Sequence, residues 1–195
     1  MKLRTGNVIL AAGQQPAGRL ICASNRIAGA KGQAAKITHG GVMYIYRLEP
    51  YIIETTSISW NGKKGFQINN YHEWLEHYKG PAWVREIDHR LDESVVARFI
   101  QKHKLDKYEN GFSGAMALLA AGIGGHHESL MKIWEFMGWQ TTTPHCTELV
   151  ALLFNYCDRS SFDVHHMPPY KLWDGGEFDQ GLYGTKLGKA EQVKE

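Results

Sequence analysis

Apolar and polar positions follow two different periods along this chain. Short runs rich in β-branched and aromatic residues, separated by Gly, Pro and Asn, dominate the part before Asp92 and predict strands. Segments in which apolar residues recur every three or four positions predict helices, and most of these follow Asp92. The expected strands are 7–10, 37–48, 51–60, 65–70 and 82–87. Strands early and helices late predict an α+β domain with an antiparallel sheet packed against helices.

The expected helices begin and end at recognisable signals. The first begins at Pro16, because proline suits a first helical turn. Its expected buried face comprises Leu20, Ile21, Ser24, Ile27 and Ala28. Further helices are expected at 71–78, 92–104, 129–139 and 143–157, while segment 112–121 is compatible with a helix or a packed linker. Connections are expected at 29–36, at Glu49–Pro50 and at 61–65.

Length and composition are those of an ordinary globular protein. The chain has 195 residues, 43% of them hydrophobic and 22% charged, which is enough to bury a core without disulfides. We expect one domain over residues 1–185, followed by a frayed tail at 186–195. The net charge is +2 and the basic residues are dispersed among acidic ones, so no nucleic-acid partner is expected. Oligomeric state is not determined by these features.

Three cysteines without a Cys-x-x-Cys pair indicate neither a disulfide framework nor a zinc ribbon. They fit a reducing compartment, and Cys22 and Cys157 are expected to pack in the core. The N-terminal apolar run, Val8 to Ala12, is too short for a secretory signal or a membrane span. We therefore expect a cytoplasmic protein without a transmembrane segment, although export by another route stays open.

Cys146 has a setting unlike that of the other two cysteines. Thr143 is a good N-cap and Pro144 a good first helical residue, which places Cys146 in the first turn of the expected helix. Unpaired backbone N–H groups and the positive end of the helix dipole favour a thiolate there. The alternative is that Cys146 is a small apolar residue of the core.

A thiolate enzyme also needs a base and a group that orients the base. His39 begins an apolar strand and is followed by Gly40 and Gly41, which leave room for close approach. Glu54 lies within the next strand, where a carboxylate is expensive to bury unless it is paired. If the two strands are neighbours, His39 and Glu54 can lie side by side. The sequence does not fix the register, so the alternative is that Glu54 faces outward.

Four short motifs together resemble the YiiX-like branch of the NlpC-type cysteine hydrolases, a circularly permuted papain-like group. They are, in order, Gly6 to Leu10, Thr38 to Val42, Ile53 to Thr55 and His145 to Val150. In that family the corresponding segments carry an opening strand, the base, the orienting carboxylate and the nucleophile. This chain departs from the family pattern with Asn7 for Asp, Thr55 for Ala, His145 for Tyr and Thr147 for Ser.

The resemblance implies a permuted papain-like fold with the nucleophile at a helix N-terminus. It implies a triad of Cys146, His39 and Glu54 that cleaves an amide bond of a peptide or peptidoglycan-type substrate through a thioester, without a metal or an organic cofactor. The oxyanion would be held by the backbone N–H of Cys146, with His145 and Thr38 as further oxyanion or substrate-binding residues. His145 could also compete with His39 as base, although adjacent helix residues do not face each other.

Other functions stay open at this level. The same fold would serve a lipid acyl hydrolase or acyltransferase, with residues 130–139 lining an acyl pocket, or a non-catalytic binding module. A metal site is a weaker alternative, because its candidate residues fit no established spacing. Those residues are His126, His127, Glu128, Asp163, His165 and His166. Trp74, Trp83 and Trp134 are expected to pack, which leaves Trp60 and Trp173 as the candidates for stacking on a ligand.

Overall fold

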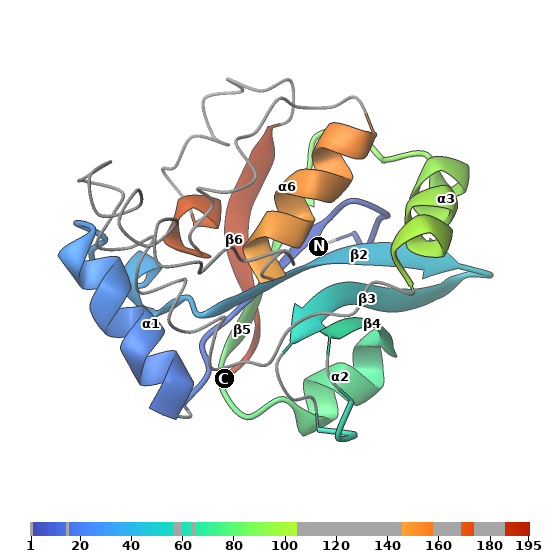
Figure 1. Cartoon of the computed structure of the whole chain (residues 1–195). Helices are drawn as coiled ribbons and strands as arrows, with labels where there is room; N and C mark the ends of the chain where they lie inside the picture. The colour runs from blue at the N-terminus through green and yellow to red at the C-terminus, as the bar shows by residue number, and fades with distance from the viewer. Residues whose placement is uncertain are drawn as a thin grey trace, which may run out of the picture.

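A six-stranded antiparallel sheet forms the centre of the molecule (Figure 1). The structure, a computed structural model of the chain, describes residues 2–14, 16–56, 60–63, 65–104, 146–157, 169–173 and 186–195. The strand order is β4-β3-β2-β1-β5-β6, and every neighbouring pair is antiparallel. The expected α+β architecture, with an antiparallel sheet packed against helices, is therefore confirmed. The expected helix at 129–139, the segment 112–121 and the start of the expected helix at 143–157 lie outside the described residues.

The described helices and strands follow the predicted order closely. The strands are β1 (Val8–Ala11), β2 (His39–Tyr46), β3 (Glu49–Thr56), β4 (Gly65–Asn70), β5 (Ala82–Ile87) and β6 (Leu187–Lys194). The α-helices are α1 (Pro16–Ile27), α2 (Tyr71–His77), α3 (Glu93–His103) and α6 (Cys146–Tyr156). Two 3₁₀ turns are η1 (Ala34–Lys36), inside the expected loop, and η3 (Pro169–Leu172).

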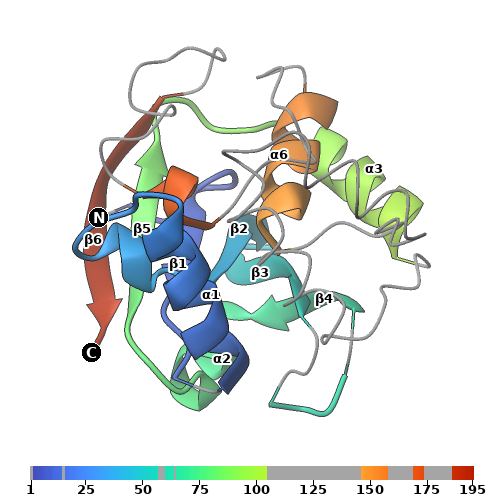
Figure 2. The ribbon, with the colours of Figure 1, turned by 60° about the vertical axis from the view of Figure 1, so that its left-hand side comes forward.

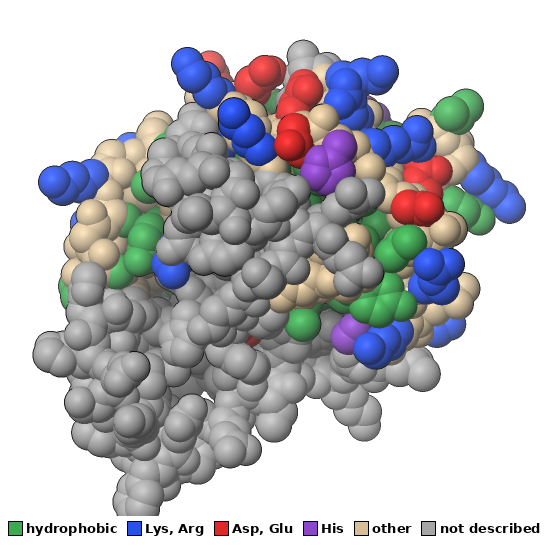
Figure 3. Space-filling model, turned by 90° about the horizontal axis from the view of Figure 1, so that it is seen from above, with side chains coloured by type: hydrophobic (Ala, Val, Ile, Leu, Met, Phe, Trp, Pro, Cys, Tyr) green, Lys and Arg blue, Asp and Glu red, His purple; other side chains and the backbone are tan. Residues whose placement is uncertain are grey.

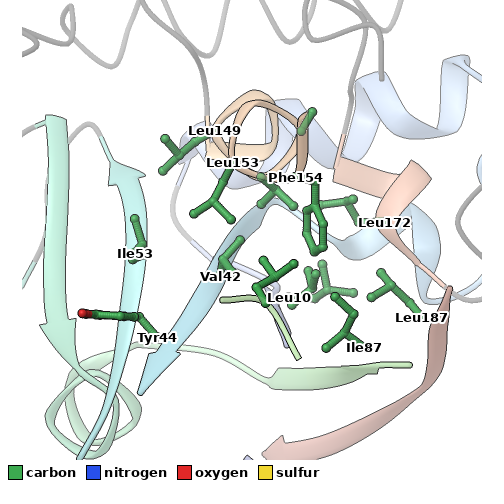
Figure 4. Close-up of a cluster of buried hydrophobic side chains, with 14 of the residues drawn as sticks. Leu10, Val42, Tyr44, Ile53, Ile87, Leu149, Leu153, Phe154, Leu172 and Leu187 are labelled. Atoms are coloured by element: carbon green, nitrogen blue, oxygen red, sulfur yellow. The ribbon is translucent and has the colours of Figure 1, made fainter. Parts of the chain in front are cut away.

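Each face of the sheet buries its own hydrophobic cluster, because side chains alternate along every strand. On one face, Leu149, Leu153 and Phe154 of α6 pack against Val42 and Leu10 of the sheet (Figure 4). The opposite face packs against α2 and buries a second cluster. Its fully buried members are Ile9, Ala11, Met43, Ile52, Tyr71, Trp74, Ala82 and Val84. The sheet thus separates α6 from α2, as Figure 1 shows.

The sequence-based prediction of the connection between β2 and β3 at Glu49–Pro50 is wrong. The turn lies at Arg47 and Leu48, with φ of 51° and 70°, while Pro50 lies inside β3 opposite Ile45. A two-residue hairpin turn with two positive φ values normally contains Asn-Gly, so nothing in Arg-Leu indicates it. Pairing of β3 with β4 begins only at Tyr51, so the missing N–H of Pro50 leaves no gap in that ladder.

The expected frayed tail is instead strand β6, which pairs with β5 at the edge of the sheet. Besides its ladder with β5, the strand is held by the side chain of Arg85 in that neighbouring strand. The fully buried guanidinium of Arg85 donates to the carbonyl oxygens of Gly188 (2.7 Å), Leu187 (3.1 Å) and Leu172 (2.9 Å). These bonds satisfy a buried cation and fix the C-terminal strand.

Helix α1 buries a narrower face than the spacing of its apolar residues predicts. Ile21 and Ser24 are buried, whereas Leu20 and Ile27 are 46% and 60% exposed. In Figure 2 the helix lies in front of the sheet. The buried Asn25 of this helix donates to the carbonyl oxygen of Ile37 at 2.7 Å, which fixes the chain just before β2.

Charge is mixed on the surface in the view of Figure 3, where Lys and Arg side chains alternate with Asp and Glu over the described part of that face. Within the described ranges, no helix is long and apolar enough to cross a membrane.

Candidate active site

His39 and Glu54 form a close pair on adjacent strands. Nε2 of His39, at the start of β2, lies 2.5 Å from Oε2 of Glu54 in β3. Their side chains are 13% and 3% exposed, so the alternative in which Glu54 faces outward is wrong. A buried carboxylate is expensive without a partner, and His39 supplies one. Because Nε2 faces Glu54, the other ring nitrogen, Nδ1, is available to a second group.

The remaining acceptor positions of Glu54 are also occupied. Nδ2 of Asn69, in β4, donates to Oε1 at 2.7 Å. The indole Nε1 of Trp74, in α2, lies 3.1 Å from each carboxylate oxygen. Donors of this kind stabilise the ionised carboxylate and fix its plane. Glu54 is therefore held in a fixed orientation beside the imidazole.

Two consecutive glycines make room for this site on opposite faces of β2. A Cβ on Gly41 would lie 2.9 Å from Cγ2 of Ile52, 3.0 Å from the carbonyl oxygen of Ile53 and 3.4 Å from Cβ of Glu54. A Cβ on Gly40 would lie 3.1 Å from Cγ2 of Thr147, in the first turn of α6. Gly41 thus lets β3 approach β2 closely, and Gly40 lets the first turn of α6 approach its other face.

Gly41→Ala is expected to lower the free energy of unfolding by about 1–3 kcal/mol, because β3 would have to move away from β2. Urea denaturation measures the change. Gly188→Ala is the matched control, since its added Cβ would meet only Glu86, at 3.5 Å or more. Equal stability of the two variants would show that close approach at Gly41 is unimportant.

Cys146 is the first residue of α6 as the structure describes it, and it is 7% exposed. Leu149, Val150 and Leu153 follow it into the hydrophobic cluster, so the start of the helix is firmly anchored. The position combines a nearly buried sulfur with a helix start, where backbone N–H groups lack intrahelical partners.

The ionisation of His39 indicates that Cys146 is its second partner. Burial by itself would lower the pKa of the imidazole. The charge of a Cys146 thiolate and a hydrogen bond with it, followed by the hydrogen bond and charge of Glu54, raise that pKa from 6.5 to about 10. An imidazole between two anions retains its proton at neutral pH. His39 is therefore placed between Glu54 and Cys146.

The two further predicted site residues have different outcomes. Thr38 is buried, and its hydroxyl accepts from the Gly13 N–H at 2.6 Å and donates to the Ala11 carbonyl oxygen at 3.4 Å. It thereby ties the end of β1 to the start of β2, and its contact with an oxyanion stays a prediction. His145 lies outside the described residues, and its role also stays a prediction.

Sequence reasoning missed three residues around the His39–Glu54 pair: Asn69, Trp74 and Tyr78. Trp74 is buried as expected, but its hydrogen bond to Glu54 was not foreseen. No local signal indicated Asn69, because Gln67 and Asn69 are buried along the edge strand β4 while Ile68 is 40% exposed, the reverse of the usual alternation.

The structure also describes the other two cysteines and the two tryptophans that were candidates for stacking on a ligand. Cys22 and Cys157 are half-buried rather than core residues, and Cys22 donates to the Lys36 carbonyl oxygen at 3.6 Å. Trp60 is 43% exposed and stacks on His77 at 4.3 Å, whereas Trp173 packs edge-on against the buried Trp83.

Comparison with known proteins identifies the fold. No protein-family model matches the chain, and no curated protein matches its sequence. Among solved structures, the metalloprotein YiiX from Escherichia coli O157:H7 (DUF1105) is similar, with a TM-score of 0.54 over 100% of this chain and 99% of that chain. This chain has a YiiX-like fold. The sequences are 14% identical, so the likeness concerns the fold alone.

Proposed function

We propose that the chain is a cysteine hydrolase of the permuted papain-like, NlpC-type kind, which cleaves an amide bond of a peptide or peptidoglycan-type substrate. Cys146 is the nucleophile, His39 the base and Glu54 the group that orients it. The observation that carries the proposal is the buried His39, with Nε2 on Glu54 at 2.5 Å and its pKa raised through the Cys146 thiolate. Such a chain of contacts is how cysteine nucleophiles are activated.

The first half of the reaction acylates the enzyme. The thiolate attacks the carbonyl carbon, a C–S bond forms, and the carbonyl oxygen takes up the negative charge. The Cys146 N–H, with His145 or Thr38, would stabilise that oxygen. When the intermediate collapses the C–N bond breaks, and the leaving amine receives the proton from Nδ1 of His39, which becomes neutral.

The second half releases the acyl group. Neutral His39 accepts a proton from water, whose oxygen attacks the thioester carbon. The C–S bond then breaks, which frees the carboxylic acid and restores the thiolate–imidazolium pair. Throughout, Glu54 keeps the proton-bearing Nε2 turned toward itself, so that Nδ1 faces the sulfur.

The alternatives from the sequence have less support. The acyl-lipid alternative depends on residues 130–139, which lie outside the described residues, and so do all six candidate metal ligands, His126 and His165 among them. YiiX is named a metalloprotein. Within the described ranges no three His, Cys, Asp or Glu side chains form a group suited to a metal ion, and the Glu54 oxygens already accept from His39, Asn69 and Trp74. A non-catalytic module would have an inert Cys146.

Labelling with electrophiles tests the proposal. The protein is treated at pH 7 with limiting iodoacetamide, and the modified cysteines are identified by peptide mass spectrometry. Cys146 is expected to react at least about tenfold faster than Cys22 and Cys157, because only Cys146 is paired with an imidazolium. Parallel reactions with amide and ester electrophiles compare the two substrate classes. Equal labelling of all three cysteines, or an unlabelled Cys146, would contradict a catalytic role.

A further inference from the structure

Helix α2 presents two aromatic side chains to the side of the sheet that carries His39 and Glu54. Trp74 lies within the helix, and Tyr78 is its C-terminal cap residue. Residues four apart share one helix face. The two rings stack with centroids 4.5 Å apart and an interplanar angle of 18°. They therefore form one rigid aromatic unit beneath the base.

Trp74 acts on the carboxylate. It is 2% exposed, and its Nε1 lies 3.1 Å from each oxygen of Glu54. Packing alone would be satisfied by an apolar ring, whereas a buried indole N–H requires an acceptor. The shared position of the N–H between both oxygens restricts rotation of the carboxylate. Trp74 thus helps to hold the carboxylate in the plane in which one oxygen faces His39.

Tyr78 acts on the imidazole. Its ring stacks on that of His39 with centroids 6.3 Å apart and an interplanar angle of 24°. Burial raises the pKa of the phenol, and a hydrogen bond with the Thr38 side chain holds the hydroxyl. Tyr78 is therefore a neutral, fixed surface that limits tilting of the imidazole.

The helix that carries both rings is anchored at its two ends. Asn70 caps its N-terminus by accepting from the N–H groups of His72 (2.9 Å) and Glu73 (3.3 Å). At the other end Nζ of Lys194, in β6, donates to the carbonyl oxygens of Leu75, Glu76 and Tyr78. A helix this short is unstable alone, so these contacts set its position.

From these contacts we propose that α2 positions the base of the active site: Trp74 fixes the carboxylate of Glu54, and Tyr78 fixes the ring plane of His39. Both are positioning residues, which act through Glu54 and His39 and not on the substrate. The inference rests on the proposed function, because the orientation of His39 matters only if His39 serves Cys146.

The test measures the rate of Cys146 alkylation by iodoacetamide at pH 7 in a double-mutant cycle of Trp74→Phe and Glu54→Gln. Trp74→Phe keeps an aromatic ring but removes the N–H, and it is expected to lower the rate about tenfold. In the Glu54→Gln background it is expected to change the rate less than about twofold, since residues that act through one another are not additive. Trp83→Phe is the matched control, because Trp83 is equally buried on the opposite face of the sheet, and its rate is expected to stay at that of the wild type.

A second readout separates positioning from general destabilisation. The pKa of His39, followed by NMR, is expected to fall in Trp74→Phe, because the carboxylate spends less time beside Nε2, and to stay unchanged in Trp83→Phe. Tyr78→Leu is expected to lower the alkylation rate as well, and it decides the question if Trp74→Phe does not fold. A wild-type rate in Trp74→Phe, or the same loss in both backgrounds, would overturn the positioning role. A wild-type protein with an unreactive Cys146 would instead refute the proposed function.

Discussion

Replacement of Cys146 with alanine is expected to abolish labelling at residue 146 and to lower any turnover of a p-nitrophenyl acetate reporter by on the order of 10³-fold or more. The loss is expected because, among the described residues, no other group occupies the position from which the Cys146 thiolate exchanges a proton with His39. The fold is expected to persist, since a sulfur that is 7% exposed is exchanged for hydrogen at a helix start, with a stability change of about 1 kcal/mol. Mass spectrometry, a steady-state assay and thermal melting measure the three outcomes.

The other two cysteines provide the controls for Cys146→Ala. Cys22→Ala and Cys157→Ala are expected to retain turnover, because both thiols are half-buried and lie outside the triad. The pKa of His39 is expected to fall in Cys146→Ala alone, since the variant removes the anion that raises it most. Turnover at the wild-type rate in Cys146→Ala would refute the mechanism, and a loss shared by all three variants would point to a general effect on folding.

Glu54→Gln is expected to lower the rate of acylation by about 10²- to 10⁴-fold with little change in shape, because it places the wrong hydrogen-bonding groups around His39. Asn69 and Trp74 both donate toward residue 54, so the amide oxygen of a glutamine would face them. Its NH₂ group would then face Nε2 of His39. An imidazole that accepts at Nε2 carries its proton on Nδ1, where it cannot take a proton from Cys146.

The same variant is expected to lower the pKa of His39 below the value of about 10 in the wild type, because the charge and hydrogen bond of Glu54 are lost. Because the folded protein binds this proton more tightly than the unfolded protein does, proton binding to His39 stabilises the fold. The stabilisation is complete below pH 6.5 and disappears as the pH rises through about 10. The Glu54→Gln variant is therefore expected to lose less stability than the wild type as the pH rises from 6.5 to about 10. NMR titration of His39 measures its pKa. Urea denaturation between about pH 6 and about pH 10.5 measures the change in stability.

Glu49→Gln is the matched control for this change, because Glu49 lies in the same strand but is exposed. It is expected to leave the acylation rate and the pKa of His39 unchanged. If Glu54→Gln behaves like Glu49→Gln, Glu54 does not orient the base, and the pair at 2.5 Å is structural only.

The sequence predicted much of the fold because its strands are short, apolar and bounded by turn residues. Strand β5 agrees with the expected residues 82–87, and α3 (Glu93–His103) lies within the expected helix at 92–104. The errors at the Arg47–Leu48 turn and at strand β6 have different causes. The turn closes a hairpin between neighbouring strands without the Asn-Gly that normally indicates it. Strand β6 is fixed by Arg85, which is distant in sequence, and a local pattern contains no information about such a partner.

For the candidate site, the sequence by itself supplied the residue types and the geometry of their local settings: a thiol at a helix start, a histidine at a strand start beside two glycines, and a carboxylate within an apolar strand. Only the tertiary structure decided that Glu54 points inward to His39, because one residue of register reverses the face of every side chain in a strand. It also brought Asn69 and Trp74 to the carboxylate and Tyr78 to the imidazole. Hydrogen bonds between side chains on different elements depend on packing, and packing is set by the whole chain.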